Sequence, residues 1–243
     1  MGRHILTAMT LTAALWLAPW AEAGAKRYWV YIGTYTGPQS KGIYAFHFDA
    51  GSGKMDPVIL AGEVTRPSFV AIHPNRKYLY AISELRTGTV TAFEINPKTG
   101  LLTPLNTVPS KGSTTAHLVV DRTGKSLVVA NYGNGVVAVF RVGADRRLSE
   151  STAQVQHNGS GPDRSQQGGP HPHAVVLSPD NRFVFVPDLG LDKVFAYRLD
   201  PAQATGRKRF GPGSRTIVAP AEPGSGRPRR CSDRGKAKSI ASR

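Results

Sequence analysis

The chain has 243 residues, 40% of them hydrophobic, and a single cysteine, Cys231. This apolar content suffices for a globular core and excludes a chain that is disordered throughout, while one cysteine excludes an intrachain disulfide and a metal site built from several cysteines. The net charge is +15, but +9 of it falls in residues 202–243, where eleven Lys or Arg accompany two acidic residues, so the charge does not indicate a nucleic-acid-binding surface on a folded domain.

Residues 1–23 have the composition of a secretory signal peptide. Arg3 precedes an apolar run from Ile5 to Trp20, and Ala21-Glu22-Ala23 is a small-x-small cleavage pattern. The alternative is a membrane anchor, but the run is near the lower limit of spanning length and Pro19 interrupts it. We therefore expect cleavage and export to the periplasm or beyond, with no membrane attachment afterwards.

A repeated pattern follows. Pro67–Ile95, Thr115–Val142 and Pro172–Leu199 align with one another, and Tyr28–Phe48 is a partial copy. The first two full copies are offset by 48 residues and the next by 57, because the last copy is preceded by an insertion at 158–169. A β-sandwich whose hairpins resemble one another by accident is the alternative explanation of this similarity.

Each full copy has the same order of features. An apolar strand leads into a polar turn, such as Ser178-Pro179-Asp180-Asn181, whose residue types favour a tight connection. A second strand, a bend, a third strand and a more polar outer strand come next, the second strands being KYLYAIS, SLVVAN and FVFVPD and the third strands TVTAFEI, VVAVFRV and KVFAYRL. Four strands at this period predict an all-β fold, a β-propeller of four-stranded blades, in which each blade needs a neighbour on both sides.

Four stretches carry motifs in a fixed order: YWVYIGTYT, PSFVAIHPNRKYLYAISE, AHLVVDRTGKSLVVANYGNGVVAVF and PHPHAVVLSPDNRFVFVPDLGLDKVFAYRLD. In this order and spacing they resemble the seven-bladed β-propeller lactonase family, which includes the propeller type of 6-phosphogluconolactonase and related carboxymuconate-cyclising enzymes. The resemblance covers about residues 28–201. It implies a ring of seven blades, of which this chain supplies about four, so we expect a partial propeller.

The resemblance ends at about Pro201. Residues 202–243 are rich in Arg, Gly, Pro and Ser, with a short apolar exception at 216–219, and we expect a disordered basic tail. Our hypothesis is that the tail is translated out of frame or ends a truncated gene product. Nucleic-acid binding by the tail is the alternative, although its basic run lacks the interleaved aromatic residues of such segments.

Histidines stand where the innermost strands of the blades begin. These strands are predicted at 69–72, 117–120 and 174–177. A propeller brings the loops that lead into them together at the mouth of its channel, so we predict His117, His171 and His173 as catalytic residues, because imidazole exchanges protons near neutral pH. Capping of a strand entry, or a hydrogen bond to a neighbouring loop, is the alternative for the last two histidines. We expect no metal, because no third ligand accompanies them.

Five further residues are candidate substrate contacts: Arg164, Gln167, Asn131, Tyr132 and Asp188. An anionic substrate would suit Arg164. The last three follow second strands, where fixing the bend is an alternative role. The resemblance also implies an Arg-Gln-Glu type sequence before PHPH, where this chain has Gln166-Gln167-Gly168. The missing carboxylate puts a family-type general acid or base in doubt.

The resemblance implies hydrolysis of a sugar-type lactone by histidine-assisted attack of water, with a small-molecule lactone as the partner and no cofactor. The alternatives are a non-catalytic exported propeller that binds protein or carbohydrate, and an inactive truncated fragment. Four blades in an arc would leave two open apolar faces, so we also expect self-association.

Overall fold

The computed structural model describes residues 27–199 and 215–218. Apart from one 3₁₀ helix, η1 (Leu189–Leu191), the regular elements of these residues are strands, which form four antiparallel sheets. The first sheet contains β1 (Arg27–Ile32), β2 (Gly42–Asp49) and β3 (Ile59–Glu63). The second contains β4 (Val70–Ile72), β5 (Tyr78–Ser83), β6 (Thr89–Ile95) and β7 (Leu102–Pro109). The third contains β8 (Thr115–Val120), β9 (Ser126–Asn131), β10 (Val136–Val142) and β11 (Leu148–Gln156). The fourth contains β12 (Val176–Leu177), β13 (Phe183–Asp188), β14 (Lys193–Arg198) and β15 (Arg215–Val218).

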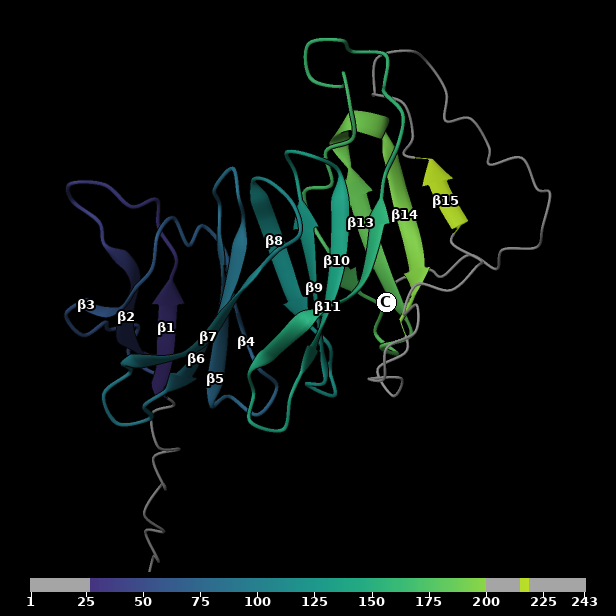
Figure 1. Ribbon diagram of the computed structural model, residues 1–243. Coiled ribbons are helices and arrows are strands. Elements are labelled where there is room, and N and C mark those ends of the chain that lie inside the picture. Colours follow the sequence, from purple (N-terminus) through teal and green to yellow (C-terminus); the bar gives the residue numbers. More distant parts are fainter. Residues whose placement is uncertain (1–26, 200–214, 219–243) are drawn as a thin grey trace, which may run out of the picture.

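The strands of each sheet lie side by side in chain order, with β4, β8 or β12 at one edge of its sheet. The sheets themselves follow one another in chain order across the molecule, as Figure 1 shows. Consecutive hairpins within a sheet, and consecutive sheets packed on one another, are the arrangement of propeller blades. The predicted all-β fold of four-stranded blades in an incomplete propeller is therefore confirmed, and the sandwich alternative is wrong.

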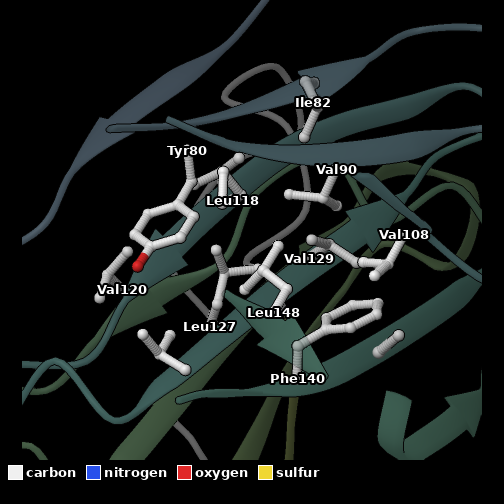
Figure 2. Close-up of a cluster of buried hydrophobic side chains, with 13 residues drawn as sticks. Tyr80, Ile82, Val90, Val108, Leu118, Val120, Leu127, Val129, Phe140 and Leu148 are labelled. Carbon is white, nitrogen blue, oxygen red and sulfur yellow. The ribbon is translucent and has the colours of Figure 1, made fainter. Parts of the chain in front are cut away.

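The core lies between the sheets rather than within any one of them. Along β5, Leu79 and Ala81 pack toward the first sheet, whereas Tyr80 and Ile82 pack toward the third. Figure 2 shows the second of these contacts, in which Tyr80 and Ile82 lie among leucine, valine and phenylalanine side chains of the third sheet. Burying a large apolar side chain contributes roughly 1.5–3 kcal/mol, so a middle blade gains much of its stability from its two neighbours.

The turns between inner and second strands join neighbouring sheets. His73 Nε2 donates to the carbonyl oxygen of Gly124 at 3.1 Å, and Asn181 Nδ2 donates to Asp121 Oδ2 at 3.0 Å. Gly124 has a φ of +69°, and a Cβ there would lie 2.2 Å from His73 Nε2. Glycine is thus required at this position both by its backbone conformation and by the close approach of the histidine. We call this end of the sheets the turn end.

One element lies where disorder was expected. Arg215–Val218 form β15 and pair with β14, at the position that the outer strand holds in the second and third sheets. The short apolar stretch noted at 216–219 overlaps this strand, and pairing to an existing edge gives it a place that its composition alone does not indicate. The rest of 202–243, and the predicted signal peptide at 1–23, lie outside the described residues.

The first sheet differs from the others. Within the described residues no strand pairs with β1 on the side away from β2, where β4, β8 and β12 lie in the other sheets. This agrees with the reading of Tyr28–Phe48 as a partial copy of the repeat. Across 27–199 and 215–218, none of the helical structure is long and apolar enough to cross a membrane.

Candidate functional site

A cleft of about 330 Å³ opens at the end of the sheets opposite the turn end, where inner strands begin and second strands end. Its wall is drawn from all four sheets and the loops that lead into them: Tyr35, Ser68, Phe69, Glu84, Thr114, Ala116, Tyr132 and His173. The loops before the inner strands therefore converge, as the repeat predicts. We call this region the cleft end.

Tyr132 organises the aromatic side of the cleft. The His171 ring stacks on the Tyr132 ring with 4.4 Å between centroids, and His171 Nδ1 donates to the Tyr132 carbonyl oxygen at 2.9 Å. The His173 ring meets the same tyrosine ring edge-on, at 5.6 Å, and lines the cleft. Of these two histidines, His173 is therefore the one whose imidazole is available to a ligand, while His171 positions Tyr132.

His117 lies deeper than the other two predicted histidines. Its ring packs against Phe69 with 3.9 Å between centroids, and the Val175 N–H donates to His117 Nδ1 at 3.4 Å. Burial, and to a smaller extent the charge of His173, lowers the pKa of His117 from 6.5 to about 4. The ring is therefore neutral at neutral pH. The structure brings the three histidines to one end of the blades but at different depths, and their catalytic roles stay predictions.

Asn131 is enclosed within its blade. It is fully buried, its Nδ2 donates to the carbonyl oxygens of Ser110 (3.1 Å) and Val136 (3.0 Å), and its Oδ1 accepts from the hydroxyls of Ser110 (2.8 Å) and Thr115 (2.7 Å). These four bonds use the hydrogen-bonding capacity of the amide. The geometry favours the alternative that Asn131 fixes the bend, and substrate contact stays an untested prediction.

Asp188 occupies the equivalent position at the end of β13 and is also buried. Its Oδ2 accepts from His157 Nδ1 at 2.5 Å, and its Oδ1 accepts from the His171 N–H at 2.7 Å. His157 is buried as well and pairs through Nε2 with the Tyr197 hydroxyl at 2.7 Å. We call these three side chains the His157–Asp188–Tyr197 network. It anchors the backbone of His171, and through that ring it positions Tyr132.

The insertion at 158–169 is fastened to η1 by Gln167. This buried side chain donates from Nε2 to the Leu189 carbonyl oxygen (2.9 Å) and to Asp192 Oδ1 (2.6 Å), and its Oε1 accepts from the Asp163 N–H (2.9 Å). Arg164 lies exposed in the same loop, outside the lining of the cleft. The structure gives Gln167 a loop-holding role, and substrate contact by either residue stays a prediction.

The cleft contains a carboxylate that the sequence analysis overlooked. Glu84 directly follows β5, in the position that Tyr132 holds after β9, and it lines the cleft. Its Oε2 accepts a hydrogen bond from the Tyr35 hydroxyl at 2.7 Å. Aligning the residues that follow the second strands would have found Glu84, because that position also identifies Tyr132.

A larger hollow, of about 570 Å³, lies at the turn end between β1 and residues 72–76. Two of its aromatic side chains are hydrogen-bonded to the backbone: Trp29 Nε1 donates to the Pro97 carbonyl oxygen (3.1 Å), and the Tyr31 hydroxyl donates to the Gly100 carbonyl oxygen (3.0 Å). It contains none of the predicted site residues. Among the residues that the structure describes, no three His, Cys, Asp or Glu side chains form a group that could hold a metal ion.

The cleft therefore joins an imidazole, a carboxylate and hydroxyl groups in one wall. Such a set can accept a proton from water, donate hydrogen bonds to an oxyanion and return a proton to a leaving oxygen. These are the requirements for adding water to a carboxylic ester.

The sequence pattern of the family described as "Lactonase, 7-bladed beta-propeller" matches residues 29–230. This match extends past Pro201, where the sequence analysis placed the end of the resemblance. Among curated relatives, the 6-phosphogluconolactonase of Bacillus subtilis is 35% identical over 191 residues, which cover 77% of this chain and 54% of that protein. The 6-phosphogluconolactonase of Formosa agariphila is 29% identical over 175 residues, which cover 70% of this chain and 50% of that protein.

Solved structures give the same result. A protein of Bacteroides fragilis matches with a TM-score of 0.73 and 30% identity, over 79% of this chain and 55% of that one. The periplasmic gluconolactonase of Pseudomonas aeruginosa matches with a TM-score of 0.69 and 31% identity, over 74% of this chain and 52% of that one. The chain thus spans about half the length of the relatives it matches. With four consecutive blades, a cleft where their inner strands begin and a family match over most of its length, the chain belongs to the seven-bladed β-propeller lactonase family.

Proposed function

We propose that the cleft hydrolyses a sugar-type lactone, with water as the nucleophile and His173 as the imidazole that exchanges a proton with the reacting groups. The observation that carries this proposal is the grouping of His173, Tyr132 and Glu84 in one cleft at the cleft end. The names of the relatives support it, since those of Bacillus subtilis and Formosa agariphila are 6-phosphogluconolactonases.

The test is proton release from lactones by the purified full chain. Glucono-δ-lactone and its 6-phosphate would each be followed at constant pH, with the spontaneous rate subtracted. We expect hydrolysis above background and a loss of about 10²–10⁴-fold in His173→Ala, the size of a general acid–base contribution. Lys98→Ala, an exposed residue outside the cleft lining, is the control. A wild-type rate equal to background with both lactones would refute the proposal.

We also propose that the protein self-associates through the open faces of the first and fourth sheets. Tyr28 and Ile32 of β1 are 46% and 44% exposed, and Val176 of β12 is 52% exposed. These large apolar side chains stand on the faces that carry no neighbouring sheet among the described residues. Uncovered apolar sheet faces favour association.

Export is a further proposal. It rests on the signal-peptide composition of residues 1–23, and the related protein of Pseudomonas aeruginosa is described as periplasmic. Expression with the native N-terminus should place the protein in the periplasmic fraction with residue 24 as its new N-terminus. An intact N-terminus in the membrane fraction would support the anchor instead.

A further inference from the structure

Glu84 is the acidic residue in the lining of the cleft. It is half-buried, and it follows β5 just as Tyr132 follows β9. The repeat therefore brings the two side chains from neighbouring blades to the same end of the sheets, and His173 joins them from the fourth sheet. The carboxylate that the family resemblance places next to Gln167, where this chain has Gly168, is thus not the acidic group of this cleft.

The backbone around Glu84 is held from two sides. The Glu84 N–H donates to the Arg66 carbonyl oxygen at 2.9 Å, and the Leu85 carbonyl oxygen accepts from the Thr114 N–H at 2.8 Å. Arg66 and Thr114 both have left-handed backbone conformations, with φ of +48° and +49°. Such conformations are uncommon for non-glycine residues. The position of the carboxylate is therefore fixed by loops from both neighbouring sheets.

The side chain of Glu84 is oriented by Tyr35. The Tyr35 hydroxyl donates to Oε2 at 2.7 Å, and the Arg66 guanidinium lies 4.9 Å from the centre of the Tyr35 ring. The hydrogen bond to Glu84, followed by burial, raises the pKa of Tyr35, so the hydroxyl keeps its proton and remains a donor. Within the described part of the chain, no Lys, Arg or His forms an ion pair with Glu84, and Oε1 is left for a ligand or water.

We propose that Glu84 is the general base of lactone hydrolysis in this cleft and that Tyr35 is its positioning residue. This inference rests on the proposed lactonase function and names the group that activates water. The Glu84 carboxylate takes a proton from water as the water oxygen bonds to the lactone carbonyl carbon, whose π electrons move onto the carbonyl oxygen. The tetrahedral adduct then breaks its ring C–O bond, and the ring oxygen takes a proton from His173 or from the protonated Glu84. The product is a hydroxy acid, which releases a proton when it ionises.

Glu84 and His173 then have different roles in the reaction. The Glu84 carboxylate is the acceptor of the proton from water, whereas the imidazole of His173 can serve as the donor to the departing ring oxygen. His117, neutral and packed on Phe69, is not among the side chains that line the cleft.

The test compares Glu84→Gln with Glu94→Gln. Glu94 is an exposed carboxylate on β6 of the same sheet, paired with Tyr78 near the turn end, so the two variants make the same chemical change at opposite ends of one blade. We expect kcat for glucono-δ-lactone to fall about 10²–10⁴-fold in Glu84→Gln and to stay unchanged in Glu94→Gln. Added formate should restore part of the activity of Glu84→Ala, because it returns a carboxylate to the emptied position.

Tyr35→Phe provides the second measurement. It removes a donor that favours the charged carboxylate, so the acid limb of the kcat/KM profile should move to higher pH. A purely structural tyrosine would lower the rate without moving that limb. If Glu84→Gln does not fold, as judged by circular dichroism, this profile decides the question, and an unmoved limb overturns the inference.

The outcomes separate the two proposals. A wild-type rate above background together with a Glu84→Gln rate within a few-fold of it would overturn the role of Glu84 and leave the lactonase proposal standing. A wild-type rate equal to background would overturn both.

Discussion

The two ends of the blades use the repeat in different ways. At the turn end, equivalent positions do equivalent work, since the turn of the second sheet bonds to that of the third at Gly124, and the turn of the fourth bonds to it at Asp121. At the cleft end, equivalent positions carry unlike residues, and the positions after the second strands hold Glu84, Tyr132 and Leu189 in turn. A repeated fold can therefore keep the contacts between its sheets constant at one end while the side chains at the other end differ in chemical type.

Removing Asp188 should give the largest loss of stability, because it tests whether the cleft end depends on its buried network. Asp188→Ala leaves His157 buried without its 2.5 Å partner, and breaking a buried pair costs about 3–5 kcal/mol. Urea unfolding followed by circular dichroism measures the difference. Asp145→Ala, an exposed carboxylate near the turn end, should change the midpoint little. Equal midpoints for both variants would show that the network adds no stability.

A substitution at Gly124 tests the turn end. Gly124→Ala places a Cβ 2.2 Å from His73 Nε2 at a φ of +69°, and we expect a loss of about 2–3 kcal/mol from the clash and the strained backbone. In His73→Ala/Gly124→Ala the clash is absent, so the double variant should be more stable than the sum of the single changes predicts. Strict additivity in a double-mutant cycle would contradict the contact.

The low pKa of His117 predicts an acid-sensitive cleft end. Because the folded protein holds this group at about 4 and the unfolded chain at 6.5, the unfolded state binds more protons between these values, and stability falls as pH drops from 6.5 to about 4. We expect the free energy of unfolding to fall by about 1 kcal/mol over this range, an amount reduced by the partial exposure of the ring. Thermal unfolding of wild type and His117→Phe across this range measures it. An equally steep fall in the variant would assign the effect to other groups.

Substitutions on the open faces of the first and fourth sheets should have the smallest effect, a weaker self-association. Val176→Lys and Ile32→Lys place charges on the two uncovered sheet faces, and each should weaken self-association several-fold because a buried charge opposes apolar contact. Sedimentation velocity over a range of concentrations would report it. Thr103→Lys, exposed on β7 of a middle sheet, is the control. A wild-type protein that stays monomeric at every concentration would remove the self-association proposal.

The strands were predictable because the two features that mark them, apolar runs and turn residues, are both local in the sequence. The second and third strands fall where SLVVAN, FVFVPD and VVAVFRV predict them, since unbroken apolar runs and turn residues mark their bounds. β15 was missed because four residues in a basic, glycine-rich stretch form a strand only by pairing with β14. The edge of an existing sheet offers backbone hydrogen bonds to such a segment, and the local composition of the segment does not indicate them.

The place of the candidate cleft was predictable, whereas the side chains that line it were not. The repeat located the convergence of the loops before His117 and His173, yet it could not tell which way a polar side chain at a strand end points. Asn131 and Asp188 turn inward to satisfy buried groups, whereas Glu84, one residue beyond the equivalent position, lines the cleft. A shift of one residue reverses side-chain direction in an extended chain. Because the repeat pattern identifies residues but not the directions of their side chains, Glu84 was not recognised as a cleft residue.

Because the apolar packing lies between the sheets, it also determines the order in which the sheets unfold. Among residues 27–199 and 215–218, the second and third sheets each pack against two neighbouring sheets, whereas the first and fourth each pack against one. Stability in such a row is a sum over adjacent pairs, so the outermost sheets should open first while the middle pair persists. Deuterium should accordingly enter the amides of β1 and β14 well before those of β5 and β9.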